Sequence, residues 1–284
     1  MRWEGVHTAL VTPFTGGELD LTSYRALCER QLRAGIHGLV ACGTTGETPT
    51  LSEPEWDRLV QAAVQVSAGS VPVTAGVGTN NTASTLDRIR RAQQLGADAG
   101  LLVMPYYNKP SPDGLRAHVA ACAAPGLPLV LYHVPGRTGQ RVPALLLAEL
   151  SQTPGVVAIK EATGDLGYAN ELLANTPISV LSGDDGTFFP LMALGGCGVI
   201  SVISDLAPAA TVALYQAAKT GDLCAARELH FGLLPVIDWL FHTTSPGPAK
   251  AALAAAGFCA NELRLPLVPL TTPVPDFVVD AVEA

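Results

Sequence analysis

A lysine interrupts a stretch of sequence that is otherwise typical of a buried strand. In VVAIKEATG (156–164), four apolar residues precede Lys160 and Glu161, and a turn of small residues follows. Burying an ammonium group is costly unless it is paired or neutralised. One interpretation is a structural ion pair, although Glu161 is adjacent on the strand and points to the opposite face. The other is an amine whose pKa is lowered by burial, so that it attacks a ketone and forms a Schiff base.

The other three lysines of the chain are weaker candidates for this chemistry. Lys109 lies in a predicted loop, where it could bind an anion, but apolar residues do not surround it. Lys219 and Lys250 lie in stretches with helical patterns, and we expect both to be solvated. Lys160 is therefore the candidate nucleophile.

Schiff-base chemistry also needs groups that carry protons, because water must leave and a proton on carbon must be removed. Hydroxyl side chains follow several predicted strands and can relay protons without bringing charge into the site. The candidates are Thr44, Thr45, Tyr106, Tyr107 and Tyr132. Each has a simpler interpretation, since a strand tyrosine commonly belongs to a core and the GTTG sequence can be a plain turn. Their common position near strand ends favours the functional one.

An arginine, Arg137, lies between glycines in PGRTG (135–139). An arginine in such a loop is either a surface residue or a clamp for a carboxylate, because the guanidinium offers two parallel N–H donors. The residues of this loop leave both interpretations open.

The elements that would position these side chains form a repeating pattern. Short apolar runs alternate with helical stretches such as 52–68 and 82–97, several of which begin with Ser, Thr or Asp as N-caps and end near glycine. Strands that are apolar on both faces and separated by helices indicate a parallel sheet. The eight apolar runs are 6–14, 38–43, 71–78, 99–105, 127–135, 156–162, 178–184 and 198–203.

Eight such units within about 220 residues predict an α/β fold, a (β/α)8 TIM barrel. The alternative is an open doubly wound sheet, which usually carries a glycine-rich phosphate loop after its first strand. The segment TPFTGGELD (12–20) lacks that spacing. From residue 221 the pattern is helical without strands. We therefore predict a catalytic barrel over residues 1–220 and a small C-terminal helical extension over 221–284, with the active site at the carboxyl ends of the strands.

The composition describes a folded protein and excludes several functions. Apolar residues make up 48% of the 284 residues and charged residues 15%, which argues against disorder. A net charge of −8 offers no basic face for nucleic acid or for an acidic membrane surface. We find no long apolar span and no signal-peptide pattern. The six cysteines form no CxxC pair and no ligand-spaced cluster with histidine. These features predict a cytoplasmic protein without a metal site.

Six motifs occur in the order and spacing of the dihydrodipicolinate synthase / N-acetylneuraminate lyase family, which the chain resembles over nearly its whole length. The motifs are GTTGE, PYYNKPS, YHVPGRTG, IKEATGD, SGDD and GGCGVISV, and the segments PGPAKAAL and LRLPLVPLT match as well. The resemblance implies a (β/α)8 barrel with a helical extension and a class I aldolase-type enzyme with pyruvate as Schiff-base donor. It implies no cofactor, since the lysine imine is itself the electron sink.

The resemblance also implies catalytic roles for individual residues. Lys160 would form the imine with pyruvate. Tyr132 would be the general acid/base above it, in a hydroxyl relay with Thr44 and Tyr107. In the family this last tyrosine reaches in from a neighbouring subunit, and the usual assembly is a homotetramer, a dimer of dimers.

Binding roles and the second substrate follow from the same resemblance. Thr45 and the GTTG backbone would hold the pyruvate carboxylate, and Gly183 and Ile200 would line the site through backbone groups. Arg137 matches the arginine that binds the carboxylate of L-aspartate-4-semialdehyde, whereas sugar-acid members carry a small or apolar residue nearby. We therefore expect condensation of pyruvate with this aldehyde, toward lysine and diaminopimelate.

Two other functions remain open on the sequence. A lyase that cleaves 2-keto-3-deoxy sugar acids or 4-hydroxy-2-oxoglutarate would use the same imine, and Arg137 would also suit a dicarboxylic substrate. A non-catalytic barrel that senses a small ligand would lack the lysine or the tyrosine of the family, and here Lys160, Tyr132, Thr44 and Tyr107 are all present.

One departure from the family lies beside the expected acid/base. The chain reads YHVP where the family usually has YNVP. Because His133 follows Tyr132 on a strand, its side chain should point away from the site. We expect it to serve packing or an interface, without a large effect on turnover.

A second departure concerns feedback inhibition by lysine. The positions that match the family's regulatory site keep Asn80 and Tyr106, but Glu53 stands where inhibited members have a basic or imidazole residue. Ser84 stands where they have the carboxylate that holds the ligand ammonium. Losing an acceptor for a buried ammonium costs about 2 kcal/mol or more, so we expect weak or absent inhibition. The other matching positions are Thr48, Pro49 and Trp56.

Overall fold

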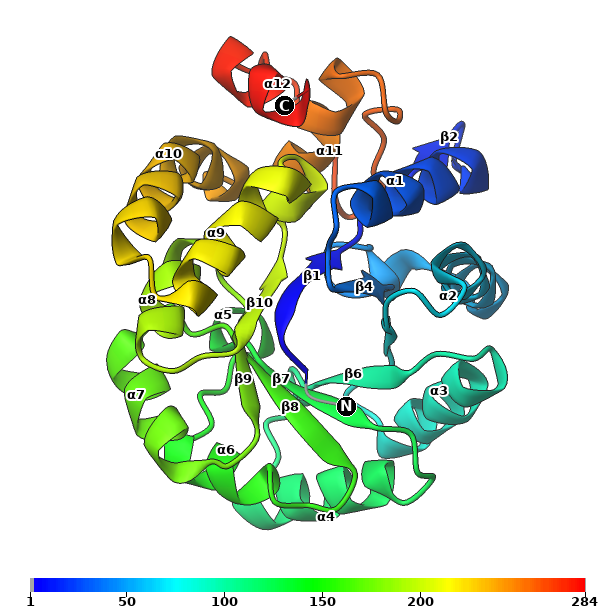
Figure 1. Cartoon of the computed structure of the whole chain (residues 1–284). Coiled ribbons are helices and arrows are strands. Elements are labelled where there is room, and N and C mark those ends of the chain that lie inside the picture. Colours follow the sequence, from blue (N-terminus) through cyan, green and yellow to red (C-terminus); the bar gives the residue numbers. More distant parts are fainter. Residues whose placement is uncertain (1–2, 284) are drawn as a thin grey trace.

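Eight parallel strands close into a barrel in the computed structural model, which describes residues 3–283 (Figure 1). Each strand overlaps one of the eight apolar runs and is shorter than it, so the predicted (β/α)8 barrel is confirmed. In chain order, each strand pairs with the next, and β1 pairs with both β4 and β10. The strands are β1 (Gly5–Ala9), β4 (Gly38–Ala41), β5 (Val73–Gly76), β6 (Ala99–Val103), β7 (Leu129–His133), β8 (Val156–Glu161), β9 (Ser179–Ser182) and β10 (Gly198–Ser201).

Helices follow the strands and cover the outside of the barrel (Figure 1). Side chains cap several of their first turns: Ser52 and Glu55 form a capping box at the start of α2, and Asp20 accepts a hydrogen bond from Ser23 N in α1. The helices are α1 (Leu21–Arg33), α2 (Glu53–Ser67), α3 (Thr82–Gln94), α4 (Pro112–Ala123), α5 (Pro135–Thr138), α6 (Ala144–Leu150), α7 (Leu166–Asn175), α8 (Phe188–Ala193) and α9 (Pro208–Thr220).

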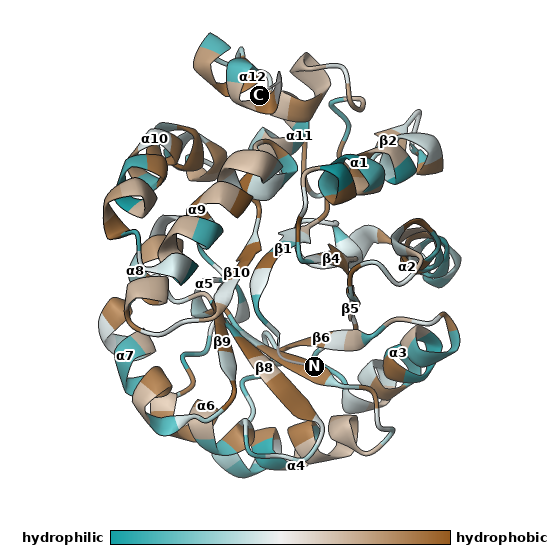
Figure 2. Cartoon of the chain, in the orientation of Figure 1, coloured by the Kyte–Doolittle hydropathy of each residue, from teal (hydrophilic) through white to brown (hydrophobic). Residues whose placement is uncertain are grey.

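Apolar side chains fill two layers. The larger lies between the strands and the helices and includes Trp56 and Ile89. The smaller lies inside the barrel and includes Val130, Tyr132 and Ile200. Strands such as β8 are largely brown in Figure 2, whereas the helices carry teal residues among the brown. Alternation along β7 thus sends Tyr132 into the barrel and its neighbour His133 toward the outer layer.

The C-terminal part is helical, with α10 (Leu223–Phe241), α11 (Gly247–Ala255) and α12 (Asp276–Glu283). Helix α10 packs against α8 and α9, and α11 contacts α10 and α12 (Figure 1). A short hairpin, β2 (Phe14–Thr15) with β3 (Glu18–Leu19), occupies the segment 12–20 and was not predicted. Among the described residues, no helix is long and apolar enough to cross a membrane. The division of the chain at residue 220 stays a prediction.

The expectation that Lys250 is solvated is wrong. Its side chain is fully buried in α11, and Nζ donates to Glu47 Oε1 at 2.7 Å and to the carbonyl of Thr12 at 2.8 Å. The reason is that α11 is alanine-rich and packs on nearly all sides, so a helical pattern there does not mark a solvated face. Lys219, in contrast, is partly exposed and pairs with Glu4.

Candidate functional site

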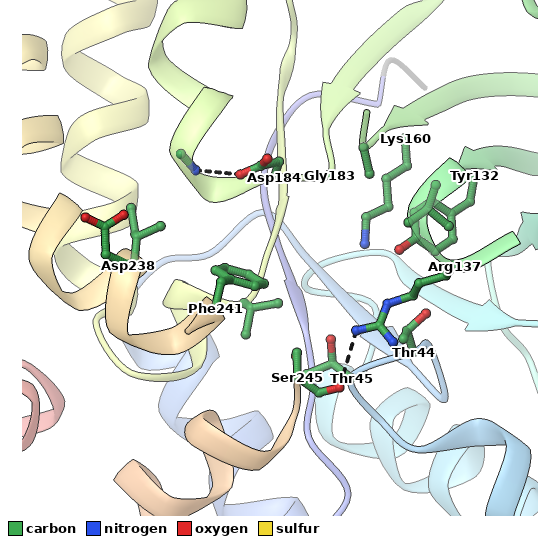
Figure 3. Close-up of a pocket in the computed structure, with 15 residues that line it drawn as sticks. Thr44, Thr45, Tyr132, Arg137, Lys160, Gly183, Asp184, Asp238, Phe241 and Ser245 are labelled. Atoms are coloured by element: carbon green, nitrogen blue, oxygen red, sulfur yellow. Dashed lines mark hydrogen bonds between the residues drawn. The ribbon is translucent and has the colours of Figure 1, made fainter. Parts of the chain in front are cut away.

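A cavity of about 460 Å³ lies at the carboxyl ends of the strands (Figure 3). It collects residues from β7, β8 and the segments after β4, β7, β8, β9 and β10, together with the end of α10 and the segment after it. Six of the residues singled out from the sequence line this site cavity: Thr44, Thr45, Tyr132, Arg137, Lys160 and Gly183. The other lining residues are Val134, Ala162, Asp184, Gly186, Val202, Ile237, Asp238, Phe241 and Ser245.

Lys160 faces Tyr132 inside the barrel. The two residues are register partners on β8 and β7, and Lys160 Nζ lies 4.3 Å from the centre of the Tyr132 ring. Lys160 is 5% exposed, and it forms no ion pair with any residue that the structure describes. Glu161 points away, where its carboxylate accepts a hydrogen bond from Thr163 N at 2.7 Å. The structural ion pair between these neighbours is therefore not formed, and the amine is left facing the cavity.

Gly183 forms the wall against which the Lys160 side chain lies. A Cβ atom at this position would lie 2.9 Å from both Cγ and Cε of Lys160 and 2.7 Å from Cβ of Ala162. Ordinary van der Waals contacts are longer than these distances. The absence of a side chain at residue 183 is thus what allows the lysine to extend into the cavity.

Thr44 and Thr45 are held on a tight turn after β4. The Gly46 N–H donates to the carbonyl of Gly43, and the Glu47 N–H donates to that of Thr44, both at 3.1 Å. Thr45 is buried, whereas Thr44 is half-buried. The two threonines therefore line the cavity from a turn that is held by hydrogen bonds within its own backbone.

Arg137 is carried by α5 and reaches the cavity from the side opposite α10 (Figure 3). Its Nη2 donates to the carbonyl of Ser245 at 3.3 Å, and the side chain forms no ion pair with a described residue. Most guanidinium donors thus remain free. A guanidinium group with free N–H donors at a cavity is suited to bind the carboxylate of a ligand.

Two predicted site residues do not line the cavity. Tyr107 is 88% exposed, with a left-handed φ of 72°, and lies outside the lining of its own chain's cavity. Ile200 is buried inside the barrel, where it packs in the same cluster as Tyr132, and Val202 lines the cavity two residues later.

Three of the seven positions expected to form a regulatory site line a second cavity of about 380 Å³, which shares Thr44, Val134 and Arg137 with the site cavity. Thr48, Pro49 and Tyr106 line it, together with Arg88. Arg88 Nη2 lies 3.1 Å from Glu53 Oε1, so this carboxylate is already paired. The remaining positions lie outside that lining: Ser84 is exposed, and the carbonyl of Asn80 accepts a hydrogen bond from Asn108.

His133 lies on the outer side of β7, behind Tyr132. It is fully buried, its ring centre lies 5.4 Å from that of Tyr168, and both ring nitrogens lack a hydrogen-bond partner. Burial, with a smaller contribution from the charge of Arg141, lowers its pKa to about 4. Near neutral pH the His133 ring is therefore uncharged, and it packs against its neighbours.

Ile237, Asp238 and Phe241 of α10, with Ser245, were missed as lining residues. No local signal distinguishes them, because they read as one helix followed by a proline-containing turn. Only the packing of α10 beside the barrel brings these residues to the cavity, where Asp238 and Phe241 lie across from Arg137 (Figure 3).

Chemically, the cavity combines a buried amine, a phenol in contact with it, two hydroxyl groups and an unpaired guanidinium. This set can bind a keto acid, form an imine and hold a second carboxylate. Among the described residues, no group of three His, Cys, Asp or Glu side chains is placed to hold a metal ion.

Comparisons with known proteins agree with this chemistry. Residues 2–284 match the profile of the dihydrodipicolinate synthetase family. The 4-hydroxy-tetrahydrodipicolinate synthase of Nitratidesulfovibrio vulgaris (strain DP4) is 47% identical over 95% of this chain and 94% of its own, and that of Thermomicrobium roseum is 46% identical over 94% and 89%. The crystal structure of dihydrodipicolinate synthase from Thermotoga maritima superposes with a TM-score of 0.93 at 42% identity, covering 100% of this chain and 97% of that one. The chain belongs to the dihydrodipicolinate synthetase family.

Proposed function

We propose that the protein condenses pyruvate with L-aspartate-4-semialdehyde through a Schiff base on Lys160, the reaction of 4-hydroxy-tetrahydrodipicolinate synthases. The observation that carries this proposal is the buried, unpaired Lys160 amine facing Tyr132 in a cavity that also holds a free Arg137. Relatives of nearly equal length with 46–47% identity carry the name of that enzyme. The product is an intermediate toward lysine and diaminopimelate.

In the first half of the reaction, Nζ of Lys160 attacks C2 of pyruvate. Water leaves, and a C2=N bond to Nζ forms. The protonated imine withdraws electrons, so that a proton leaves C3 and an enamine forms. No metal or organic cofactor is part of this proposal, because the imine supplies the electron sink.

In the second half, C3 of the enamine attacks the aldehyde carbon of the semialdehyde, and the new oxygen takes up a proton. The amino group of the bound semialdehyde then adds to C2 and displaces Nζ, which closes the ring and frees Lys160. One water leaves in forming the first imine, and the lysine is regenerated as an amine.

Tyr132 is the proposed acid/base, because it is the hydroxyl-bearing side chain in contact with the Lys160 amine. Thr44 would relay protons to it, and Tyr107 would complete the relay in the cavity of a neighbouring subunit. The exposure of Tyr107 and its position outside its own cavity support that role. We propose a homotetramer, acting in the cytoplasm, with Tyr107 exchanged within each dimer.

The proposed binding sites are separate for the two substrates. Thr45 and the backbone of its turn would hold the pyruvate carboxylate, and Arg137 would hold the carboxylate of the semialdehyde. Gly183 lines the site cavity and would border the pyruvate site; Ile200 does not line the cavity, whereas Val202, two residues later, does.

A substrate panel tests the assignment. Pyruvate is offered with aspartate semialdehyde, and pyruvate release is followed from N-acetylneuraminate, 2-keto-3-deoxygluconate and 4-hydroxy-2-oxoglutarate. We expect only the condensation to run, Lys160→Ala to abolish it, and the exposed Lys219→Ala to leave it unchanged. Dominant cleavage of a sugar acid would overturn the substrate assignment. Failure of borohydride to trap pyruvate on Lys160 would overturn the imine.

A further inference from the structure

The segment 245–250 (SPGPAK) contacts both ligand-binding parts of the site: its first residue, Ser245, lines the site cavity, and its last, Lys250, lies outside the lining. At its start, the Ser245 carbonyl accepts the hydrogen bond from Arg137 Nη2 at 3.3 Å. At its end, Lys250 Nζ donates to Glu47 Oε1 at 2.7 Å. Glu47 directly follows the GTTG turn in the sequence. One short segment of the C-terminal extension therefore touches the arginine and the turn at once.

The Glu47–Lys250 pair is sealed from solvent. Both side chains are 0% exposed, and neither residue lines the site cavity, so neither touches a substrate. The second carboxylate oxygen accepts a hydrogen bond from Arg264 N at 3.1 Å, and Nζ lies 4.4 Å from the ring centre of Phe14. Leaving one buried charge without its partner is strongly unfavourable, so separating Glu47 from Lys250 would cost a large free energy.

The pair acts on the backbone of the GTTG turn. Glu47 has a φ of 53°, in the left-handed region that non-glycine residues seldom adopt. Its buried carboxylate accepts hydrogen bonds from Lys250 Nζ and Arg264 N, while its own N–H donates to the carbonyl of Thr44. Lys250 also binds the carbonyl of Thr12, whose hydroxyl donates to the carbonyl of Gly46 at 2.8 Å. The lysine thus holds the turn by two routes.

We propose that Glu47 and Lys250 are positioning residues: their buried ion pair fixes the GTTG turn so that Thr45 and the backbone of the turn meet the carboxylate of pyruvate. Through Ser245, the same segment sets the distance from this turn to Arg137. This inference deepens the proposed function and rests on its assignment of the pyruvate site.

Three variants test the pair. Glu47→Gln keeps the shape and removes the charge, Lys250→Met removes the amine, and the double variant removes both charges together. Lys219→Met is the matched control, because Lys219 pairs with Glu4 at the surface. We expect the two single variants to raise KM for pyruvate at least about tenfold while kcat changes much less, since saturating pyruvate can still be bound by the displaced turn. The control should match the wild type.

A second readout separates positioning from loss of fold. Borohydride trapping with pyruvate alone gives both the half-saturating pyruvate concentration and the fraction of chains that can form the imine. A raised half-saturation with a full trapped fraction supports the inference. An unchanged half-saturation with a smaller trapped fraction, or with only a lower melting temperature, overturns it.

If a single variant does not fold, the double variant tests the inference instead. Removing both buried charges together leaves neither of them unpaired. If it folds and binds pyruvate like the wild type, the inference is wrong. If the wild type traps pyruvate but does not condense it with the semialdehyde, the proposed substrate fails while the trapping assay still tests the pair.

Discussion

Gly183→Ala is the smallest change that tests how Lys160 is held. The added Cβ would lie 2.9 Å from Cγ and Cε of Lys160 and 2.7 Å from Cβ of Ala162. Its φ lies outside the left-handed region, so alanine causes no backbone strain there. The effect of the substitution is therefore steric and falls on Lys160 and on its neighbour Ala162.

The size of the effect follows from these distances. Ordinary contacts begin at about 3.4 Å, so the lysine stem must move by about 0.5 Å. Misplacing a reacting group by about 1 Å can cost on the order of a hundredfold in rate. We expect kcat/KM to fall by about 10- to 100-fold, which corresponds to roughly 1.4–2.7 kcal/mol. Overpacking should lower the free energy of unfolding by about 1–3 kcal/mol.

The assay combines the rate of borohydride-trapped imine formation with steady-state condensation and urea unfolding. Gly232→Ala is the control, because a Cβ at this position in α10 meets no atom within 4 Å. It should stabilise the helix by about 0.5–1 kcal/mol and leave the rates unchanged. If Gly183→Ala forms the imine at the wild-type rate, the wall does not position Lys160 and the reasoning is refuted.

Three further predictions follow from other parts of the structure. Mixing Tyr107→Ala with Lys160→Ala subunits should restore up to about a quarter of wild-type activity, because one site of each mixed dimer is complete; no recovery would mean that Tyr107 does not cross an interface. His133→Asn should keep turnover within a few-fold. The pKa of His133 is lowered from 6.5 to about 4, so the wild type loses stability as pH falls from 6.5 toward 4. Between pH 7.5 and pH 5, the free energy of unfolding in urea should therefore fall by about 2 kcal/mol less for the variant than for the wild type. Lysine should inhibit weakly, with Glu53 held by Arg88 and Ser84 offering no carboxylate; an inhibition constant below about 1 mM would contradict this.

The barrel could be predicted from the sequence because its signal is local. Each strand is a short apolar run, and each polar segment after it marks a carboxyl end. The predicted strands were too long because apolar residues such as Leu10 and Val11 are buried beyond the last ladder pair of β1. The order of motifs placed Lys160, Tyr132 and Arg137 at one end, where the structure also brings them together.

Lys250 shows why the rest could not be predicted. Its helix is a run of alanines, which gives no polar face from which burial could be inferred. Its partner Glu47 lies 203 residues earlier, so the contact exists only once the barrel is closed and α11 has returned to it. The same holds for Phe241 and Ser245, which line the cavity through chain geometry and not through any local pattern.

The Glu47–Lys250 pair also bears on the order in which parts of the protein can fold during synthesis. Lys250 follows Glu47 by 203 residues and follows its other acceptor, Thr12, by 238. At about 5–20 residues per second, the counter-ion of Glu47 is synthesised roughly 10–40 s after Glu47 itself. During that interval, burying Glu47 would leave a carboxylate unpaired and dehydrated. We therefore expect the GTTG turn of the nascent chain to stay in water until α11 has been synthesised and can pack against it.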